Sequence, residues 1–178
     1  MYKRQAFRRS TTANPFPSQM GRVCPAPCQS GCNRNEVDDY VGINAVEQFI
    51  GDTAFKEGFK FDPAPKLKKQ RVAIIGGGPA GMSAAYQLRK KGYASTVFEE
   101  REQLGGMMRY GIPNYRTPRD ILDAEIQRIL DLGDIEVVLN TRVGKDVPLE
   151  DVEKSHDAVL WTIGCWNCLL YTSDAADE

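Results

Sequence analysis

The sequence predicts an α/β fold in which a Rossmann-like domain follows a small α-helical segment. Three observations predict it. A short apolar run, Val72 to Ile75, is bounded by glycine, as is typical of a parallel strand buried on both faces. A G-x-G-x-x-G sequence follows directly and opens a helical pattern. Upstream, Cys24, Cys28 and Cys32 lie at C-x3-C-x3-C spacing between prolines and glycines.

Length and composition limit the chain to one full domain, or to one domain with an appendage. Its 178 residues are 42% hydrophobic, enough for one buried core but not for two domains of ordinary size. A formal net charge of -1, from 23 basic and 24 acidic residues, gives no electrostatic footprint for nucleic acid or an anionic membrane. No apolar run approaches the roughly 20 residues of a membrane span. We therefore expect a cytoplasmic protein, in which clustered cysteines are metal ligands or redox groups more readily than disulfides.

The two ends of the chain predict segments that are foreign to the natural protein. Tyr2 to Gln5 can be encoded by TAT AAG AGA CAG, and the reverse complement of these codons, read one base over, encodes Cys168 to Tyr171. One inverted DNA element at both ends is typical of a sequencing adapter, although two natural peptides could show the same complementarity by chance. We expect residues 1–5 and 168–178 to be adapter-like scars, and the natural protein to continue beyond both.

Residues 6–61 are expected to form a partial helical domain. After the cysteines, apolar residues recur at helical spacing and predict a helix from about Asn44 to Glu57 that ends near Gly58; they are Val41, Ile43, Val46, Phe49 and Ile50. Residues 62–70 contain two prolines and a basic run, which predicts an extended linker. The α/β domain is expected to occupy residues 71–167.

The pattern of the α/β domain alternates strands and helices. The helix after the glycine-rich turn is predicted from Ala80 to Lys91, with small residues on its early turns that allow close approach to the sheet. Thr96 to Glu99 is predicted as the second strand. Residues 118–133 have the apolar face of a helix that ends at Gly133. Residues 135–144 and 156–164 contain two further strand-like runs.

Gly76, Gly78 and Gly81 predict a dinucleotide-binding turn, because strand, helix and a following acidic residue are in register. Gly76 would form the turn, Gly78 would let the backbone approach a pyrophosphate, and Gly81 would allow close helix packing. The free N–H groups at the helix N-terminus would receive the negative charge. Glu99 would accept hydrogen bonds from an adenosine ribose and repel a 2′-phosphate, so FAD or NAD is expected rather than NADP. A glycine-rich turn without a ligand is the alternative.

The residues after the second strand indicate which dinucleotide binds. Gly105 and Gly106 form a second glycine pair. The pair resembles that of the two-dinucleotide-binding flavoproteins, where it also lines the flavin pyrophosphate. The phrases MMRYGIPNYR and AVLWTIG resemble the small subunit of glutamate synthase and the electron-input module of dihydropyrimidine dehydrogenase. The resemblance implies an incomplete FAD-binding domain of this type and extends the cofactor site to Pro79, Ala80, Glu100, Arg109, Val143 and Gly164.

The same resemblance gives the cysteines a role. The N-terminal helical domain of this family carries two 4Fe-4S clusters, which implies that Cys24 and Cys28 serve one cluster and Cys32 the other. A Gln or Glu ligand on the next helix would correspond to Glu47. The chain lacks the upstream cysteines of the family, so both clusters would be incomplete. Two alternatives stay open: a zinc site, for which the chain has only the distant His156, and structural cysteines without metal.

The implied function is that of an NAD(P)H-dependent flavin oxidoreductase. NADPH or NADH would deliver a hydride to the flavin, and single electrons would pass to the clusters and on to an electron-accepting catalytic subunit or fused domain. The nicotinamide site is expected beyond Asn167, and Cys165 in a turn near the flavin. No side chain is expected to act as a catalytic acid, base or nucleophile. The alternative is a cluster-free FAD-binding assembly or scaffold subunit.

Overall fold

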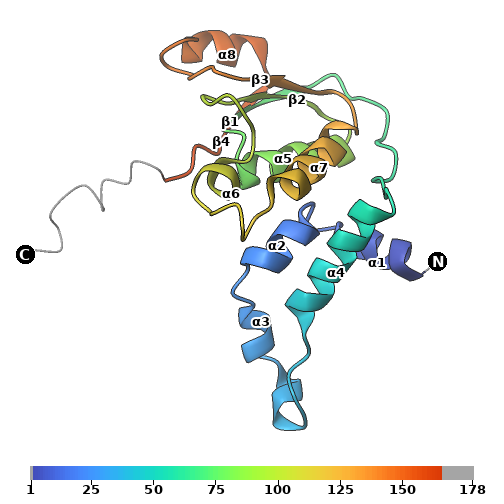
Figure 1. The fold of residues 1–178 in the computed structure, drawn as a ribbon. Helices are drawn as coiled ribbons and strands as arrows, with labels where there is room; N and C mark the ends of the chain where they lie inside the picture. The colour runs from blue at the N-terminus through green and yellow to red at the C-terminus, as the bar shows by residue number, and fades with distance from the viewer. Residues whose placement is uncertain (1, 166–178) are drawn as a thin grey trace, which may run out of the picture.

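A computed structural model describes residues 2–165, so the predicted scar at 168–178 lies outside the described residues. Figure 1 shows a sheet with helices on both faces and, below it, a narrower group of helices from the N-terminal part of the chain. None of the described helices has the length and hydropathy needed to cross a membrane. The arrangement confirms an α/β fold preceded by a helical segment.

The sheet contains four parallel strands in the order β3-β2-β1-β4. Its strands are β1 (Arg71–Ile75), β2 (Ala94–Phe98), β3 (Ile135–Val138) and β4 (Ala158–Trp161). All four predicted strands are present, although the second begins before Thr96 and ends one residue before Glu99. In the central pairing, Val72 lies opposite Ser95 on one side and Ala158 on the other. All four strands therefore end on the same edge of the sheet.

Helices cover the two faces of the sheet unequally. Helices α5 (Pro79–Lys90), α6 (Gly106–Tyr110) and α7 (Arg119–Leu130) lie on one face, and α8 (Leu149–Ser155) lies on the other. On the first face, Ile74 and Val97 pack with side chains of α5 and α7; on the second, Ala73 and Ile75 pack with Val152. The predicted helices over α5 and α7 are confirmed, and α7 ends at Leu130, before the turn that contains Gly133. Helices α6 and α8 have five and seven residues, too few to show a helical period.

The regular elements of the N-terminal part are all helices. It consists of α1 (Tyr2–Ser10), α2 (Pro17–Val23), α3 (Pro27–Ser30), the 3-10 helix η1 (Asn33–Glu36) and α4 (Ile43–Lys56). The predicted helix over α4 is confirmed, together with its end near Gly58. Gly58 has a φ of 63°, and the Phe59 N–H donates to the Ala54 carbonyl at 2.9 Å, as expected of a Schellman stop.

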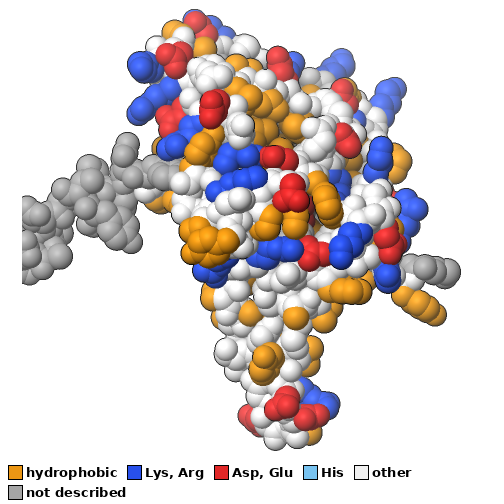
Figure 2. Space-filling view, in the orientation of Figure 1, with side chains coloured by type: hydrophobic (Ala, Val, Ile, Leu, Met, Phe, Trp, Pro, Cys, Tyr) orange, Lys and Arg blue, Asp and Glu red, His pale blue; other side chains and the backbone are white. Residues whose placement is uncertain are grey.

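The packing face of α4 differs from the apolar face that the sequence suggests. Val46 and Phe49 are 54% and 59% exposed, whereas Gly51 and Ala54 are buried. Gly51 lies against the backbone of Ser18, so a Cβ at this position would overlap with α2. Small residues let the two helix backbones approach, and the larger apolar side chains stay outside, where Figure 2 shows hydrophobic side chains along this part of the molecule.

The residues of the predicted linker, 62–70, have no helix or strand in the structure. They follow the edge of the α/β domain: the Lys68 N–H donates to the Gly92 carbonyl at 2.8 Å, and Arg89 Nη1 donates to the Pro65 carbonyl at 2.9 Å. The segment is therefore hydrogen-bonded to the domain that it leads into.

Candidate functional site

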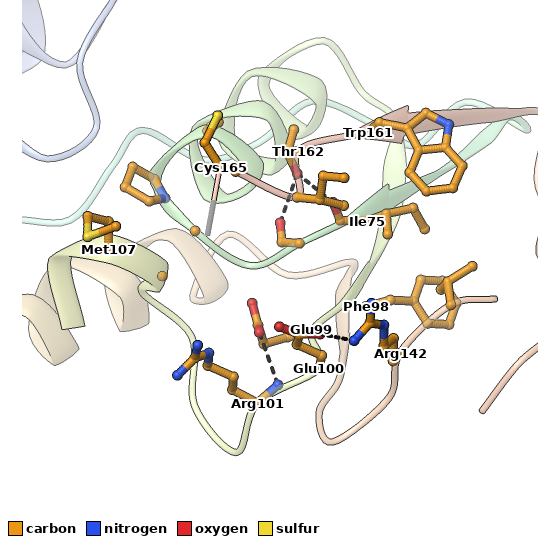
Figure 3. A pocket seen from close by; sticks show the side chains of 18 of the residues that line it. Ile75, Phe98, Glu99, Glu100, Arg101, Met107, Arg142, Trp161, Thr162 and Cys165 are labelled. Atoms are coloured by element: carbon orange, nitrogen blue, oxygen red, sulfur yellow. Dashed lines mark hydrogen bonds and ion pairs between the residues drawn. The ribbon is translucent and has the colours of Figure 1, made fainter. Parts of the chain in front are cut away.

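A cavity of about 510 Å³ opens at the edge of the sheet where the strands end. Its walls come from the last residues of β1, β2 and β4, from the first turns of α5 and α6, and from residues 141–143. Figure 3 shows Trp161, Thr162 and Cys165 on one side and Glu99, Glu100 and Arg142 on the other. The carboxyl edge of a parallel sheet is where ligands bind in open α/β folds, and the volume lies in the range of cofactor sites.

The three glycines of the turn have different structural reasons to be glycine. Gly76 has a φ of 109°, and a Cβ there would overlap with the Thr162 carbonyl. A Cβ on Gly81 would overlap with the Gly76 carbonyl, so the start of α5 lies directly on the strand end. Gly78 has a φ of -75°, and the nearest atom to a Cβ there is the Gly106 Cα at 3.7 Å. The fold therefore requires Gly76 and Gly81 but has room for a side chain at Gly78, on the cavity wall.

Helix α5 directs its N-terminus into the same cavity. Gly78 is its N-cap, and Pro79 and Ala80 of its first turn also line the cavity. The first N–H groups of a helix have no partner within the helix, and they carry the positive end of the helix dipole. This wall is therefore suited to a phosphate group.

Glu99 lies at the end of β2 and is 6% exposed. One carboxylate oxygen accepts the Gly77 N–H at 2.7 Å, and the other accepts the Arg101 N–H at 3.0 Å. These bonds hold the carboxylate in place on the cavity wall. Each oxygen has a second lone pair, which leaves acceptor capacity for the two hydroxyls of a ribose.

The second glycine pair lies beside the first turn. The Gly105 N–H donates to the Gly77 carbonyl at 2.9 Å, and Gly106 lines the cavity opposite Gly78. Glu100, Val143 and Gly164 also line it. The structure thus brings most of the predicted cofactor residues to one cavity. Gly81 and Gly105 are not among the lining residues; they contact Gly76 and Gly77 of the turn.

Arg109 is placed differently from the other predicted cofactor residues. It is not among the described residues that line the cavity. Its Nε donates to the Leu104 carbonyl at 2.5 Å, and its guanidinium forms an ion pair with Asp123 of α7. In this conformation Arg109 fixes α6 to α7.

Several residues of the cavity have no counterpart among the residues predicted from sequence. They include Phe98, Thr141, Arg142, Trp161, Thr162 and Ile163. Thr162 Oγ1 donates to the Ile75 and Gly76 carbonyls at 3.0 and 2.9 Å, which joins the end of β4 to the glycine turn. Arg142 forms an ion pair with Glu100 at 3.8 Å. Their position at or soon after the ends of parallel strands was the available signal, since such ends converge. Cys165, which is expected in a turn near the flavin, also lines the cavity.

The cysteine segment does not form a closed metal site in the described part of the chain. Cys24 is the C-cap of α2, Cys28 lies in α3, and Cys32 precedes η1. Within residues 2–165 no three Cys, His, Asp or Glu side chains are placed to share a metal ion. Glu47 accepts a hydrogen bond from Asn14 Nδ2 at 2.7 Å. The segment has one feature of a thiolate loop, since the Ala26 N–H donates to Cys24 Sγ at 3.4 Å.

His156 is remote from the cysteines in its contacts. Its Nε2 lies 2.9 Å from Thr96 Oγ1, and its Nδ1 lies 3.0 Å from the Val152 carbonyl. It joins the end of α8 to the sheet.

Each of the two parts of the chain matches a known protein family. Residues 74–133 match the family of NAD(P)-binding Rossmann-like domains, and residues 2–59 match dihydropyrimidine dehydrogenase domain II, 4Fe-4S cluster. The chain is 37% identical over 162 residues to the glutamate synthase (NADPH) small chain of Bacillus subtilis. The aligned region covers 90% of this chain and 33% of the relative. The chain is thus similar to a glutamate synthase small chain over most of its own length.

Longer proteins contain the same region. Glutamate synthase (NADH) of Schizosaccharomyces pombe is 41% identical over 165 residues, which covers 90% of this chain but 8% of that protein. The chain thus spans a third or less of these glutamate synthase relatives. Among solved structures, FprA of Mycobacterium tuberculosis in complex with NADPH matches with a TM-score of 0.50 and 21% identity, over 55% of this chain and 23% of FprA. This last likeness concerns the fold.

Proposed function

We propose that the chain is the FAD-binding part of an NAD(P)H-dependent flavin oxidoreductase of the glutamate synthase small-chain type. The observation that carries the proposal is that residue 78 is glycine although the fold has room for a side chain there. Its backbone conformation is open to any residue, and a Cβ on this cavity-lining residue would have the Gly106 Cα, at 3.7 Å, as its nearest neighbour. The reason for glycine at this position therefore lies in a ligand that needs the space, next to the N-terminus of α5.

The residues of the cavity fit the adenosine diphosphate half of FAD. The α5 N-terminus at Gly78 and Ala80 would bind the pyrophosphate, and Gly106 would let it approach from the other side. Glu99 would accept hydrogen bonds from the ribose hydroxyls. When bound, FAD accepts a hydride from a nicotinamide and releases electrons one at a time. The chain itself would bind and orient, and we assign no acid or base role to its side chains.

The cysteine segment gives the finer part of the proposal. We place 4Fe-4S clusters there and an electron-accepting catalytic subunit or fused domain beyond them, in a cytoplasmic enzyme. The family match of residues 2–59 and the fused glutamate synthase relative support this part. Each cubane takes four protein ligands, so Cys24, Cys28 and Cys32 need partners from outside the segment.

The flavin site is tested by Gly78→Val in the full-length protein that contains this chain. The expected result is loss of bound FAD with retained folding, because the side chain fills the pyrophosphate position. Gly42→Val is a matched control: Gly42 is the N-cap of α4 with a φ of -71°, away from the cavity. Flavin content is measured by absorbance after purification, and folding by circular dichroism. Equal flavin content in the two variants would reject the site.

The alternative is a cluster-free FAD-binding assembly or scaffold subunit. Iron and acid-labile sulfide analysis of anaerobically purified full-length protein separates the two. Iron that falls by about one cluster in Cys24→Ser, Cys28→Ser, with flavin retained, supports the cluster-containing enzyme. Wild-type protein with flavin but without iron supports the assembly subunit.

A further inference from the structure

Helix α2 is capped at its N-terminus by a side chain of the α/β domain. Its N-cap residue, Phe16, has no capping side chain, and Pro17 in its first turn has no N–H to satisfy. The next two N–H groups, of Ser18 and Gln19, donate to the two carboxylate oxygens of Glu125 at 2.8 and 3.1 Å. Glu125 on α7 therefore supplies the acceptors that an N-cap residue ordinarily supplies locally.

Glu125 is held in this position by burial and by charge. It is 1% exposed, so its oxygens have little access to water as an alternative partner. Burial raises its pKa to about 7, while the Ser18 and Gln19 N–H groups and the charges of Arg128 and Arg22 favour the ionised form. Arg128 lies on the same helix, and Arg22 approaches from α2. The carboxylate thus accepts from two donors in a place where losing either bond leaves a buried N–H unsatisfied.

The other end of α2 leads into the first cysteine. Cys24 is the C-cap residue, and its N–H donates to the Met20 carbonyl at 2.9 Å. The seven residues of α2 span about 10 Å at the usual helical rise. Arg22 forms two hydrogen bonds with Asp52 of α4, at 2.8 and 2.9 Å. Helix α2 is therefore a short rigid connection between Glu125 and the cysteine segment.

Helix α7, which carries Glu125, packs against α5, the helix that begins at the Gly76–Gly81 turn. Leu122, Ile126 and Ile129 of α7 belong to one core cluster with Met82 and Ala85 of α5. Helix α5 begins at the turn, so the order of contacts runs from the turn through α5 and α7 to Glu125, and through α2 to Cys24.

We infer that Glu125 is a positioning residue for the cysteine segment and fixes the place of Cys24 relative to the Gly76–Gly81 turn. Its importance for electron transfer rests on the proposed function, because only there do the two elements hold redox centres. The two hydrogen bonds from Ser18 and Gln19 to Glu125 are a property of this chain and can be tested without flavin or iron.

The test is amide hydrogen exchange of the full chain in three variants. Glu125→Gln has one acceptor oxygen and turns an NH2 group toward the second donor, so protection of residues 18–24 should fall about tenfold. Glu125→Asp keeps two acceptor oxygens and should recover part of the protection. Asp120→Asn makes the same chemical change on the exposed side of α7 and should leave α2 unchanged. Protection of α5 is the internal reference.

Two further readings separate a positioning role from a general structural one. The alkylation rate of Cys24 should rise in Glu125→Gln while that of Cys165 stays the same. Protection of α2 in the wild type should also change as pH passes through about 7, relative to α5, and this change should be absent in Glu125→Gln. Equal losses in α2 and α5, or no loss in either, would overturn the inference. Absence of iron and flavin in the wild type would overturn the proposed function and leave this result in place.

Discussion

A Cβ placed on Gly106 would lie 2.7 Å from the Cα of Gly78, whereas a Cβ on Gly78 would lie 3.7 Å from the Cα of Gly106. The first distance forces a backbone to move, and the second is ordinary van der Waals contact. Gly106 also has a φ of 48°, in the left-handed region that favours glycine. The two facing glycines therefore have different roles: the fold requires one, and the other keeps space for a ligand.

Replacement by alanine should separate these roles. Gly106→Ala is expected to lower the free energy of unfolding by about 1–3 kcal/mol, through backbone strain and the clash with Gly78. Gly78→Ala should change it by less than about 1 kcal/mol, because the conformation at Gly78 suits alanine. Urea denaturation of the ligand-free chain measures both. Equal losses would contradict the distinction.

Glu125 predicts a pH dependence of stability. Its pKa is raised from the ordinary value of 4.5 to about 7, so between these pH values the folded state holds a proton that the unfolded state releases. The contribution of Glu125 to stability is therefore greatest below pH 4.5 and falls as pH rises to about 7, by roughly 3 kcal/mol in all. Urea denaturation of wild type and Glu125→Gln from pH 4.5 to 8 checks this: the difference between the two should shrink or reverse across the range. A constant difference would argue against it.

Removing the hydrogen bonds between Arg22 and Asp52 should lower the free energy of unfolding, whereas removing an exposed ion pair should not. Burial acts to raise the pKa of Asp52, but hydrogen bonds from Arg22 and Ser18 outweigh it and leave the pKa lowered. Asp52→Asn should cost about 1–3 kcal/mol at neutral pH, and the cost should disappear as pH falls well below 3.8. Asp38→Asn, which removes the exposed partner of Arg34, should have little effect. Thermal or urea denaturation of both variants gives the comparison.

Tyr86 provides a further test of how the two parts are joined. Its hydroxyl, on α5, donates to the Thr11 carbonyl at 2.6 Å in a buried position. Tyr86→Phe should lower the free energy of unfolding by about 1–2 kcal/mol, because a buried carbonyl loses its donor. Tyr115→Phe, at a residue that is 88% exposed, should be neutral. A neutral Tyr86→Phe would show that the bond does not stabilise the junction.

The glycine turn and Glu99 could be predicted from sequence because their spacing is local. A strand, three glycines at fixed offsets and an acid at the next strand end leave few arrangements other than a dinucleotide site. The opposite wall of the cavity could be predicted less well. Trp161 and Thr162 reach it only because β4 pairs with β1 from more than 80 residues away along the chain, and a strand end shows where residues converge but not which of them face the cavity.

The helical segment shows where sequence patterns mislead. Apolar spacing located α4 correctly but not its buried face, since the contact with α2 is made by Gly51 on one side and Gly21 on the other. Glu125 and Arg128 are charged residues on the buried face of α7, and in the sequence Glu125 resembles a surface position. Its burial depends on donors 106 and 107 residues away, and no local pattern contains that information.

The linker at 62–70 divides the chain in sequence but not in its core. Phe16, from the helical segment, belongs to the same hydrophobic cluster as Ile74 of the sheet, and the rings of Phe7 and Phe61 stack at 5.7 Å. A gene cut within the linker would give two products with exposed apolar surfaces and an uncapped α2. A fusion that joins this α/β domain to a different electron acceptor must therefore include the helical segment, because the two share one hydrophobic core.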